Sequence, residues 1–186
     1  MGSLSGGTAG VLAAQLAAFV AVLLAVSAGH KVVKWSYSRN VVREFAGLPH
    51  HVATAALAAA ALGEAVAGVL LLLPGAHLRM IGASLAAAIW AAYLVFILRA
   101  VLQGRREVDC GCSFGSGAGA NHRPLGAFQI GRNAVLLGLA ILVAASARGA
   151  VPVQGSQLLA ACALLALYGA LDQVMALAPM RSGEVS

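Results

Sequence analysis

The 186-residue chain is 61% hydrophobic and only 10% charged, whereas a soluble globular domain carries about 25% charged residues. Its length fits one domain, and its long continuous apolar runs exclude the short alternating segments of a transmembrane β-barrel. The formal net charge of +6 would suit a nucleic-acid ligand, but the basic residues flank apolar runs, which is typical of membrane topology. The sequence therefore predicts an all-α, polytopic integral membrane protein without a nucleic-acid partner.

Five apolar runs are long enough to cross a bilayer as helices. They cover about residues 11–28, 52–73, 78–102, 128–147 and 157–177. No basic segment precedes the first run, so we expect it to be a membrane span and not a cleaved signal peptide. Within it, Gln15 is expected to make a polar contact between helices. The sequence thus predicts a single transmembrane domain over residues 1–186, surrounded by membrane lipids.

The first polar segment, residues 30–51, mixes basic residues with aromatic and aliphatic ones. Such a stretch can lie as an interfacial helix, with its rings at the headgroup level and its basic groups toward water. A docking surface or a site for an acidic ligand is the alternative. We predict the interfacial helix, because aromatic residues beside basic ones are common at the membrane edge.

Glu64 lies near the middle of the second apolar run. A carboxylate at that depth costs on the order of 3 kcal/mol on insertion scales, so an ionisable residue there is a functional hypothesis by default. A carboxyl group that only ties helices together by hydrogen bonds is the alternative. The small residues around it would permit close helix packing in either case. The sequence leaves both interpretations open.

The distribution of basic residues predicts an orientation in the membrane. Ten of the 12 Lys and Arg residues lie in or beside the two polar loops and the C-terminal tail, and the exceptions are Arg79 and Arg148. Because loops rich in Lys and Arg stay in the cytoplasm, both large loops and the tail are predicted to face it.

The second polar loop, residues 103–124, holds two of the three cysteines, Cys110 and Cys112, on either side of Gly111. A disulfide across one residue needs a tight turn, which glycine permits, and strained or exposed disulfides are the labile, catalytic kind. We therefore predict a redox pair. A metal site made by Cys110, Cys112 and His122 is an alternative, as are inert loop cysteines. Cys162, inside the fifth run, is expected to be a buried small hydrophobic residue.

Four stretches of the chain resemble the MauE (methylamine utilisation) branch of the DoxX-like membrane proteins. They are Ser27 to Lys31, Glu44 to Pro49, Gly63 to Gly68, and Cys110 to Gly115 followed by Arg132-Asn133. The resemblance covers about residues 11–143. The chain departs from the family pattern at Ser113, which is inserted before Phe114, and in its fifth span, which exceeds a four-helix core.

The resemblance implies a four-helix bundle core with a fifth transmembrane helix, located in the cell (inner) membrane. It implies a thiol–disulfide oxidoreductase that exchanges electrons with a thioredoxin-like partner through Cys110 and Cys112. Glu64, Lys31, Arg132 and Asn133 match family positions as supporting residues. No cofactor is expected, and a membrane quinone is the alternative electron carrier.

The resemblance and the charge distribution disagree about the side of the membrane. The family is expected to act on thiols outside the cytoplasm, whereas the basic loops are predicted to face inward. The runner-up function is a non-enzymatic assembly or stabilising subunit of a larger membrane complex, which would pack on a neighbour through small-residue faces.

Overall fold

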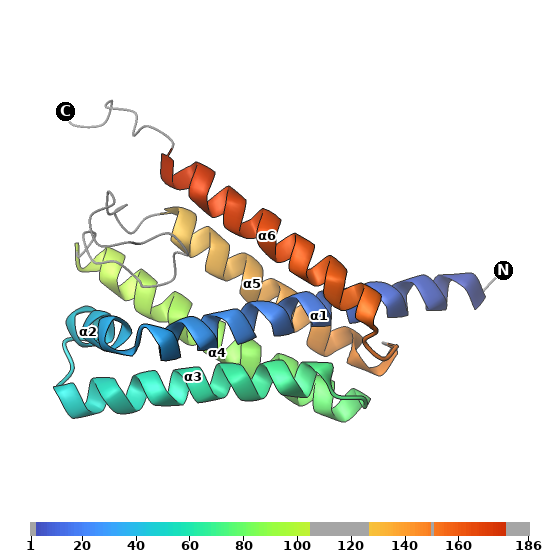
Figure 1. Cartoon of the computed structure of the whole chain (residues 1–186), viewed down its shortest axis with the longest axis horizontal. Coiled ribbons are helices and arrows are strands. Elements are labelled where there is room, and N and C mark those ends of the chain that lie inside the picture. The colour runs from blue at the N-terminus through green and yellow to red at the C-terminus, as the bar shows by residue number, and fades with distance from the viewer. Residues whose placement is uncertain (1–2, 105–126, 150, 178–186) are drawn as a thin grey trace.

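The computed structural model describes residues 3–104, 127–149 and 151–177. Within these ranges the chain is helical between short turns (Figure 1). The elements are α1 (Ser3–Val33), α2 (Trp35–Ala46), α3 (His50–Leu72), α4 (Ala76–Leu102), α5 (Ala127–Ser146), the 3-10 turn η1 (Ala147–Gly149) and α6 (Gly155–Leu177). The predicted all-α architecture is confirmed.

Four helices are long and apolar enough to cross a membrane. Their spanning segments are Gly7–Val33, His50–Leu72, Ala76–Leu102 and Phe128–Ser146, and Gly155–Leu171 in α6 is a shorter apolar helix. The chain is therefore a multi-pass membrane protein with a core of four spans, as predicted. A fifth crossing by α6 remains a prediction.

The first helix lies at the centre of the bundle (Figure 1). It packs on α3, α5 and α6, and α4 packs on α3 and α5. The protein itself buries 56% of the apolar segment of α1, against 22–33% of the other three spans. Ala14, Ala17 and Ala18 in α1 are fully buried, because small side chains let neighbouring backbones approach on several sides. Gln15 donates a hydrogen bond to the carbonyl oxygen of Gln157 in α6 at 3.3 Å, which confirms its predicted interhelical contact.

Glycines set the closest approach between α3 and α4. A Cβ atom built on Gly82 would lie 2.9 Å from the Cβ of Leu70 and 3.0 Å from the carbonyl oxygen of Ala67. Gly68 permits a similar but less close contact between α3 and α1, since a Cβ there would lie 3.3 Å from the carbonyl oxygen of Ala21. The position of α4 on α3 thus depends on a missing side chain at Gly82.

The polar segment after α1 forms the predicted helix, α2. It ends at Gly47, which adopts the left-handed conformation (φ 64°) and donates its N–H to the carbonyl of Arg43, a common helix C-terminus for glycine. The turn through Pro49 then leads into α3, and α2 packs on both α3 and α1. The second helix therefore closes one end of the bundle, and its placement at a membrane surface remains a prediction.

The helices alternate in direction, so their connections fall at two ends of the bundle (Figure 1). The end of α1, the helix α2, the end of α4 and the start of α5 share one end, and the described basic residues there include Arg43, Arg99 and Arg132. Arg79 begins α4 and Arg148 lies in η1 at the other end. This separation agrees with the predicted two-sided charge distribution.

The prediction that Cys162 is buried is wrong. Cys162 is exposed on the surface of α6. In the described chain α6 packs mainly on α1, so a single face of it is covered, and that face carries Gln157 and Ala161 one turn apart. Cys162 is one residue further along, about 100° around the helix, and faces outward.

Candidate functional site

Cys110, Cys112 and His122 lie outside the described residues. The segment that contains them joins the end of α4, at Leu102, to the start of α5, at Ala127. Both helix ends belong to the end of the bundle that α2 closes (Figure 1). We call this segment the cysteine loop. The described residues at this end of the bundle are the ones that lie nearest to the two helix ends from which it starts and at which it finishes.

A buried ion pair joins α1 to α3. The ammonium of Lys31 lies 2.8 Å from each carboxylate oxygen of Glu64. The side chain of Glu64 is 1% exposed and that of Lys31 is 17% exposed. Lys31 is near the end of α1, and its long apolar stem lets the charged group reach a carboxylate deeper in the bundle. The structure thus brings together two of the residues that matched the family.

Two hydroxyl groups complete the coordination of this pair. Tyr93 in α4 donates a hydrogen bond of 2.7 Å to the carboxylate of Glu64, and Ser27 in α1 donates one of 3.1 Å to the same oxygen. The Lys31 ammonium also donates to the Ser27 hydroxyl at 2.7 Å and lies 5.5 Å from the centre of the Tyr93 ring, within the range of a cation–π contact. We call Ser27, Lys31, Glu64 and Tyr93 the polar cluster.

The polar cluster balances its own charge. One ammonium faces one carboxylate, and the carboxylate accepts hydrogen bonds from both hydroxyl groups. Buried ions are tolerated when they are paired and their remaining hydrogen-bonding capacity is used. Glu64 therefore links three helices, α1, α3 and α4. Hydrogen bonding between helices was one of the two roles that the sequence left open for this residue. Its partner Lys31 is also part of a cavity wall.

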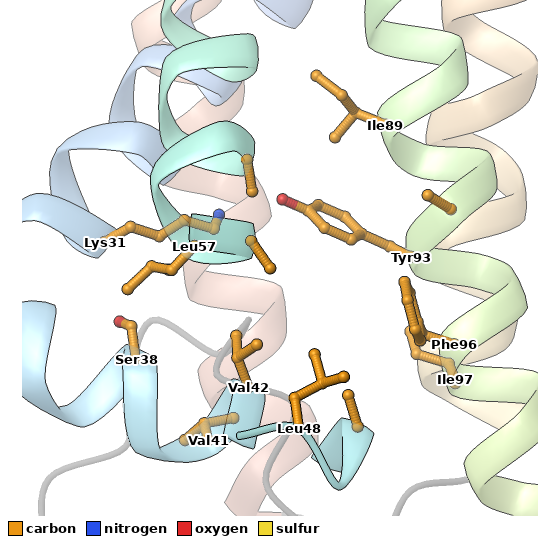
Figure 2. A pocket seen from close by; sticks show the side chains of 14 residues that line it. Lys31, Ser38, Val41, Val42, Leu48, Leu57, Ile89, Tyr93, Phe96 and Ile97 are labelled. Carbon is orange, nitrogen blue, oxygen red and sulfur yellow. The ribbon is translucent and has the colours of Figure 1, made fainter. Parts of the chain in front are cut away.

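A partly open cavity of about 300 Å³ lies beside the polar cluster. Its walls come from α1, α2, α3, α4 and the turn after α2, and they are mostly apolar; they include Val42, Leu57 and Phe96. Figure 2 shows the Lys31 ammonium and the Tyr93 hydroxyl pointing toward one another from opposite sides. Ser38, a buried residue of α2, is a further polar residue in the wall. This volume is at the lower end of small-molecule sites, about 300–1,000 Å³.

Arg132 and Asn133 take up a different position. Both are on α5, where Asn133 is buried and donates a hydrogen bond of 3.0 Å to the carbonyl of Gln129 in the same helix. None of the hydrogen bonds that form the polar cluster involves Asn133. Of the four supporting residues of the resemblance, Lys31 and Glu64 therefore belong to the polar cluster. Arg132 and Asn133 lie near the start of α5, which follows the cysteine loop in the chain.

Ser27 and Tyr93 were not predicted as site residues. Ser27 lies four residues before Lys31, so the two share a face of α1, and this spacing was a usable signal. Tyr93 is one of three aromatic residues, with Trp90 and Phe96, inside the third predicted span, and such a pattern usually indicates helix packing. A phenol inside an apolar span needs a hydrogen-bond partner, and the carboxylate of Glu64 was the available acceptor on the preceding span.

The described residues hold no group of three or more His, Cys, Asp or Glu side chains that could bind a metal ion. The alternative metal site, Cys110 with Cys112 and His122, lies outside them. It therefore remains an untested alternative.

Comparison with known protein families identifies a match over most of the chain. The family model described as methylamine utilisation protein MauE matches residues 9–146, a range that runs from α1 to the end of α5 and includes the polar cluster and the cysteine loop. No curated protein and no solved structure matches the chain.

Proposed function

We propose a function from the premise that this chain belongs to the MauE family, whose model matches most of its length. The protein is proposed to be a thiol–disulfide oxidoreductase of the cell (inner) membrane, with Cys110 and Cys112 as its redox pair. Its partner is proposed to be a thioredoxin-like protein. By the family's name, the process that it serves is methylamine utilisation.

The observation that carries this proposal is the Cys-Gly-Cys sequence in the connection between two membrane-spanning helices of a family member. A membrane protein with its cysteines in such a connection can present them at the bilayer surface, where a partner's active site can reach them. The sequence around them is rich in glycine and serine, with little side-chain bulk to obstruct that approach.

The proposed reaction is a dithiol–disulfide exchange. The thiolate of one cysteine attacks a sulfur of the partner's disulfide, forming a mixed disulfide and releasing one partner thiolate. The second cysteine then attacks the chain's own sulfur in that mixed disulfide and releases the partner's second thiol. The pair is oxidised to a disulfide while the partner gains two electrons and two protons, and the reverse sequence oxidises a partner dithiol. We assign the first attack to Cys110, which lies closer to Arg105 and Arg106 in sequence, because nearby positive charge favours a thiolate.

The polar cluster supports the proposal as a positioning device. Glu64 fixes α1, α3 and α4 relative to one another, and α4 leads directly into the cysteine loop. A helix end that is held in place gives the loop a fixed starting point. Ser27, Lys31, Glu64 and Tyr93 are thus positioning residues in this proposal, and the cysteines carry the chemistry.

Trapping tests the proposal. In a Cys112→Ser variant the mixed disulfide formed by Cys110 cannot be resolved, so a covalent complex with a thioredoxin-like protein should accumulate and disappear on reduction. The Cys162→Ser variant is the matched control, since Cys162 is an exposed residue of α6, and it should form no trapped complex. The proposal fails if Cys110→Ser and Cys112→Ser each keep full activity in a thiol–disulfide exchange assay that follows both reduction and oxidation of the partner.

The same variants identify the side of the membrane. A membrane-impermeant maleimide added to intact cells labels Cys110 if the loop faces outward, as the family resemblance implies. Labelling only after cell lysis places the loop in the cytoplasm, as the ten basic residues predict.

A further inference from the structure

The cavity beside the polar cluster has no role in the thiol exchange just described, and its chemistry restricts what it can hold. Its wall is largely apolar, and it lies between helices of the membrane-spanning bundle. Its volume of about 300 Å³ admits one ring-sized group and not the two acyl chains of a phospholipid. A ligand of this cavity is therefore small or enters with only part of its length.

The charge balance of the cluster points to a neutral ligand. The ammonium of Lys31 is already paired with the carboxylate of Glu64 at 2.8 Å. A fatty-acid carboxylate bound here would lie close to a second carboxylate, and a cationic amine would lie close to the ammonium. Like charges brought together in a site of low dielectric are costly. A neutral molecule avoids both penalties.

Polar residues in the wall favour a ligand that has polar atoms over a pure hydrocarbon. Lys31, Ser38 and Tyr93 are the polar residues of the described wall, and the Lys31 ammonium is neutralised by Glu64. The rings of Tyr93 and Phe96 on α4 offer apolar faces for a flat ring (Figure 2). The exposed fraction of Phe96 is 47%, so its ring lies at the edge of the cavity, where an apolar tail can leave toward the lipid.

From these features we propose that the cavity binds the head group of a lipid-soluble quinone. A quinone is a neutral flat ring with carbonyl acceptors and an apolar tail, which matches the charge, the wall and the open edge of the cavity. The cavity includes Ile97, near the end of α4, so it belongs to the end of the bundle from which the cysteine loop departs.

The role of a quinone bound in this cavity rests on the proposed function. If Cys110 and Cys112 form a redox pair, the quinone is their electron acceptor. Two thiols give two electrons and two protons to the quinone; one disulfide bond forms and the quinone becomes a quinol. The new disulfide then oxidises a partner dithiol, and this fixes the direction of electron flow from partner to membrane.

Photolabelling tests the site without relying on the cysteines. The full chain in lipid nanodiscs is irradiated with an azido-substituted benzoquinone, and labelled peptides are mapped by mass spectrometry. We expect label on α2 and α4, at least a tenfold reduction of it by excess decylubiquinone, and no reduction by decylbenzene, which has the tail and ring without the carbonyl groups. Label confined to α5 and α6, which contribute no residue to the described cavity wall, or equal competition by decylbenzene, would overturn the proposal.

Two matched substitutions on α3 sharpen the test. Ala60 lines the cavity, whereas Ala58 is exposed and does not line it. Ala60→Leu fills the cavity and should lower labelling at least tenfold, and Ala58→Leu should keep it within twofold. Ala92→Leu fills the cavity from α4 and replaces Ala60→Leu if that variant does not fold. Unchanged labelling in a folded cavity-filling variant contradicts the proposal.

The two proposals fail separately. Labelling in the Cys110→Ser/Cys112→Ser variant should equal that of the unaltered chain, because neither residue belongs to the described cavity wall. Binding without thiol cycling would refute the proposed function and keep the cavity assignment. Thiol cycling without binding would refute the cavity assignment alone.

Discussion

Replacing Lys31 with Met should destabilise the protein more than any exposed charge substitution, because Glu64 would lose its counter-ion while remaining buried. At 2.8 Å and an effective dielectric constant of about 20, the attraction between the two charges is about 6 kcal/mol. Desolvation of the two ions offsets much of it, at several kcal/mol each. The intact pair therefore contributes little net stability, but removal of one partner is expected to cost about 3–5 kcal/mol.

The assay is the free energy of unfolding in mild detergent, measured by titration with a denaturing detergent for the unaltered chain, Lys31→Met, Glu64→Gln and the double variant. The double variant should recover at least about 2 kcal/mol of the loss in Lys31→Met, because the neutral amide that replaces the Glu64 carboxylate needs no counter-ion. The amide oxygen can still accept the hydrogen bonds of Ser27 and Tyr93. A double-mutant cycle thus measures the coupling between the two positions.

Glu44→Gln is the matched control. Glu44 lies 3.9 Å from Arg43, and both side chains are largely exposed, so the substitution should change stability by less than about 1 kcal/mol. Additive effects of Lys31→Met and Glu64→Gln, or a loss in Lys31→Met no larger than that in Glu44→Gln, would refute the assignment of a coupled buried pair.

Three further comparisons test packing and hydrogen bonding by the same unfolding measurement. Gly82→Ala should cost about 1–3 kcal/mol, since its Cβ would meet the backbone and Leu70 of α3. The control Gly138→Ala, with open space around it, should be neutral or slightly stabilising. Equal effects of the two substitutions would contradict the close α3–α4 contact. Cys162→Leu should change the free energy of unfolding by no more than about 0.5 kcal/mol. The neighbouring substitution Ala161→Leu, at a fully buried position, should cost about 1–3 kcal/mol. The reverse order of effects would mean that α6 packs through another face. Tyr93→Phe should cost about 1.5–3 kcal/mol, the range for hydrogen bonds to charged groups. This loss of stability should be smaller when Glu64→Gln is already present. An equal loss in both backgrounds would show that the Tyr93 hydroxyl does not stabilise the protein through Glu64.

The helical spans were predictable because apolar runs of 18 or more residues have few other uses. The observed helices begin and end within a few residues of the predicted spans, except that α1 runs on from Ser3 to Val33. That extension carries Lys31 within the helix, and hydropathy alone does not register it because polar residues at a span end lower the local average. The helix over Trp35–Ala46 was predictable from its mixed basic and aromatic composition.

The site was predictable only in part. Glu64 was conspicuous as a carboxylate in an apolar run, and Lys31 entered through the family resemblance, but neither feature says that the two meet. Their contact depends on how far α1 and α3 slide along one another, and on the reach of the lysine stem. The side of α6 that Cys162 occupies depends likewise on the face that packs on α1, which helix composition does not determine.

The redox state of Cys110 and Cys112 tests directly whether the two cysteines form a redox pair. The purified chain is equilibrated in buffers of graded thiol–disulfide potential, alkylated with a heavy maleimide, and weighed by mass spectrometry, with the Cys162→Ser variant used to remove the third thiol. We expect a reversible two-electron transition in which both cysteines change together under mild reduction. Cysteines that stay free at every potential, or that stay locked until the protein unfolds, would contradict it and favour an assembly subunit.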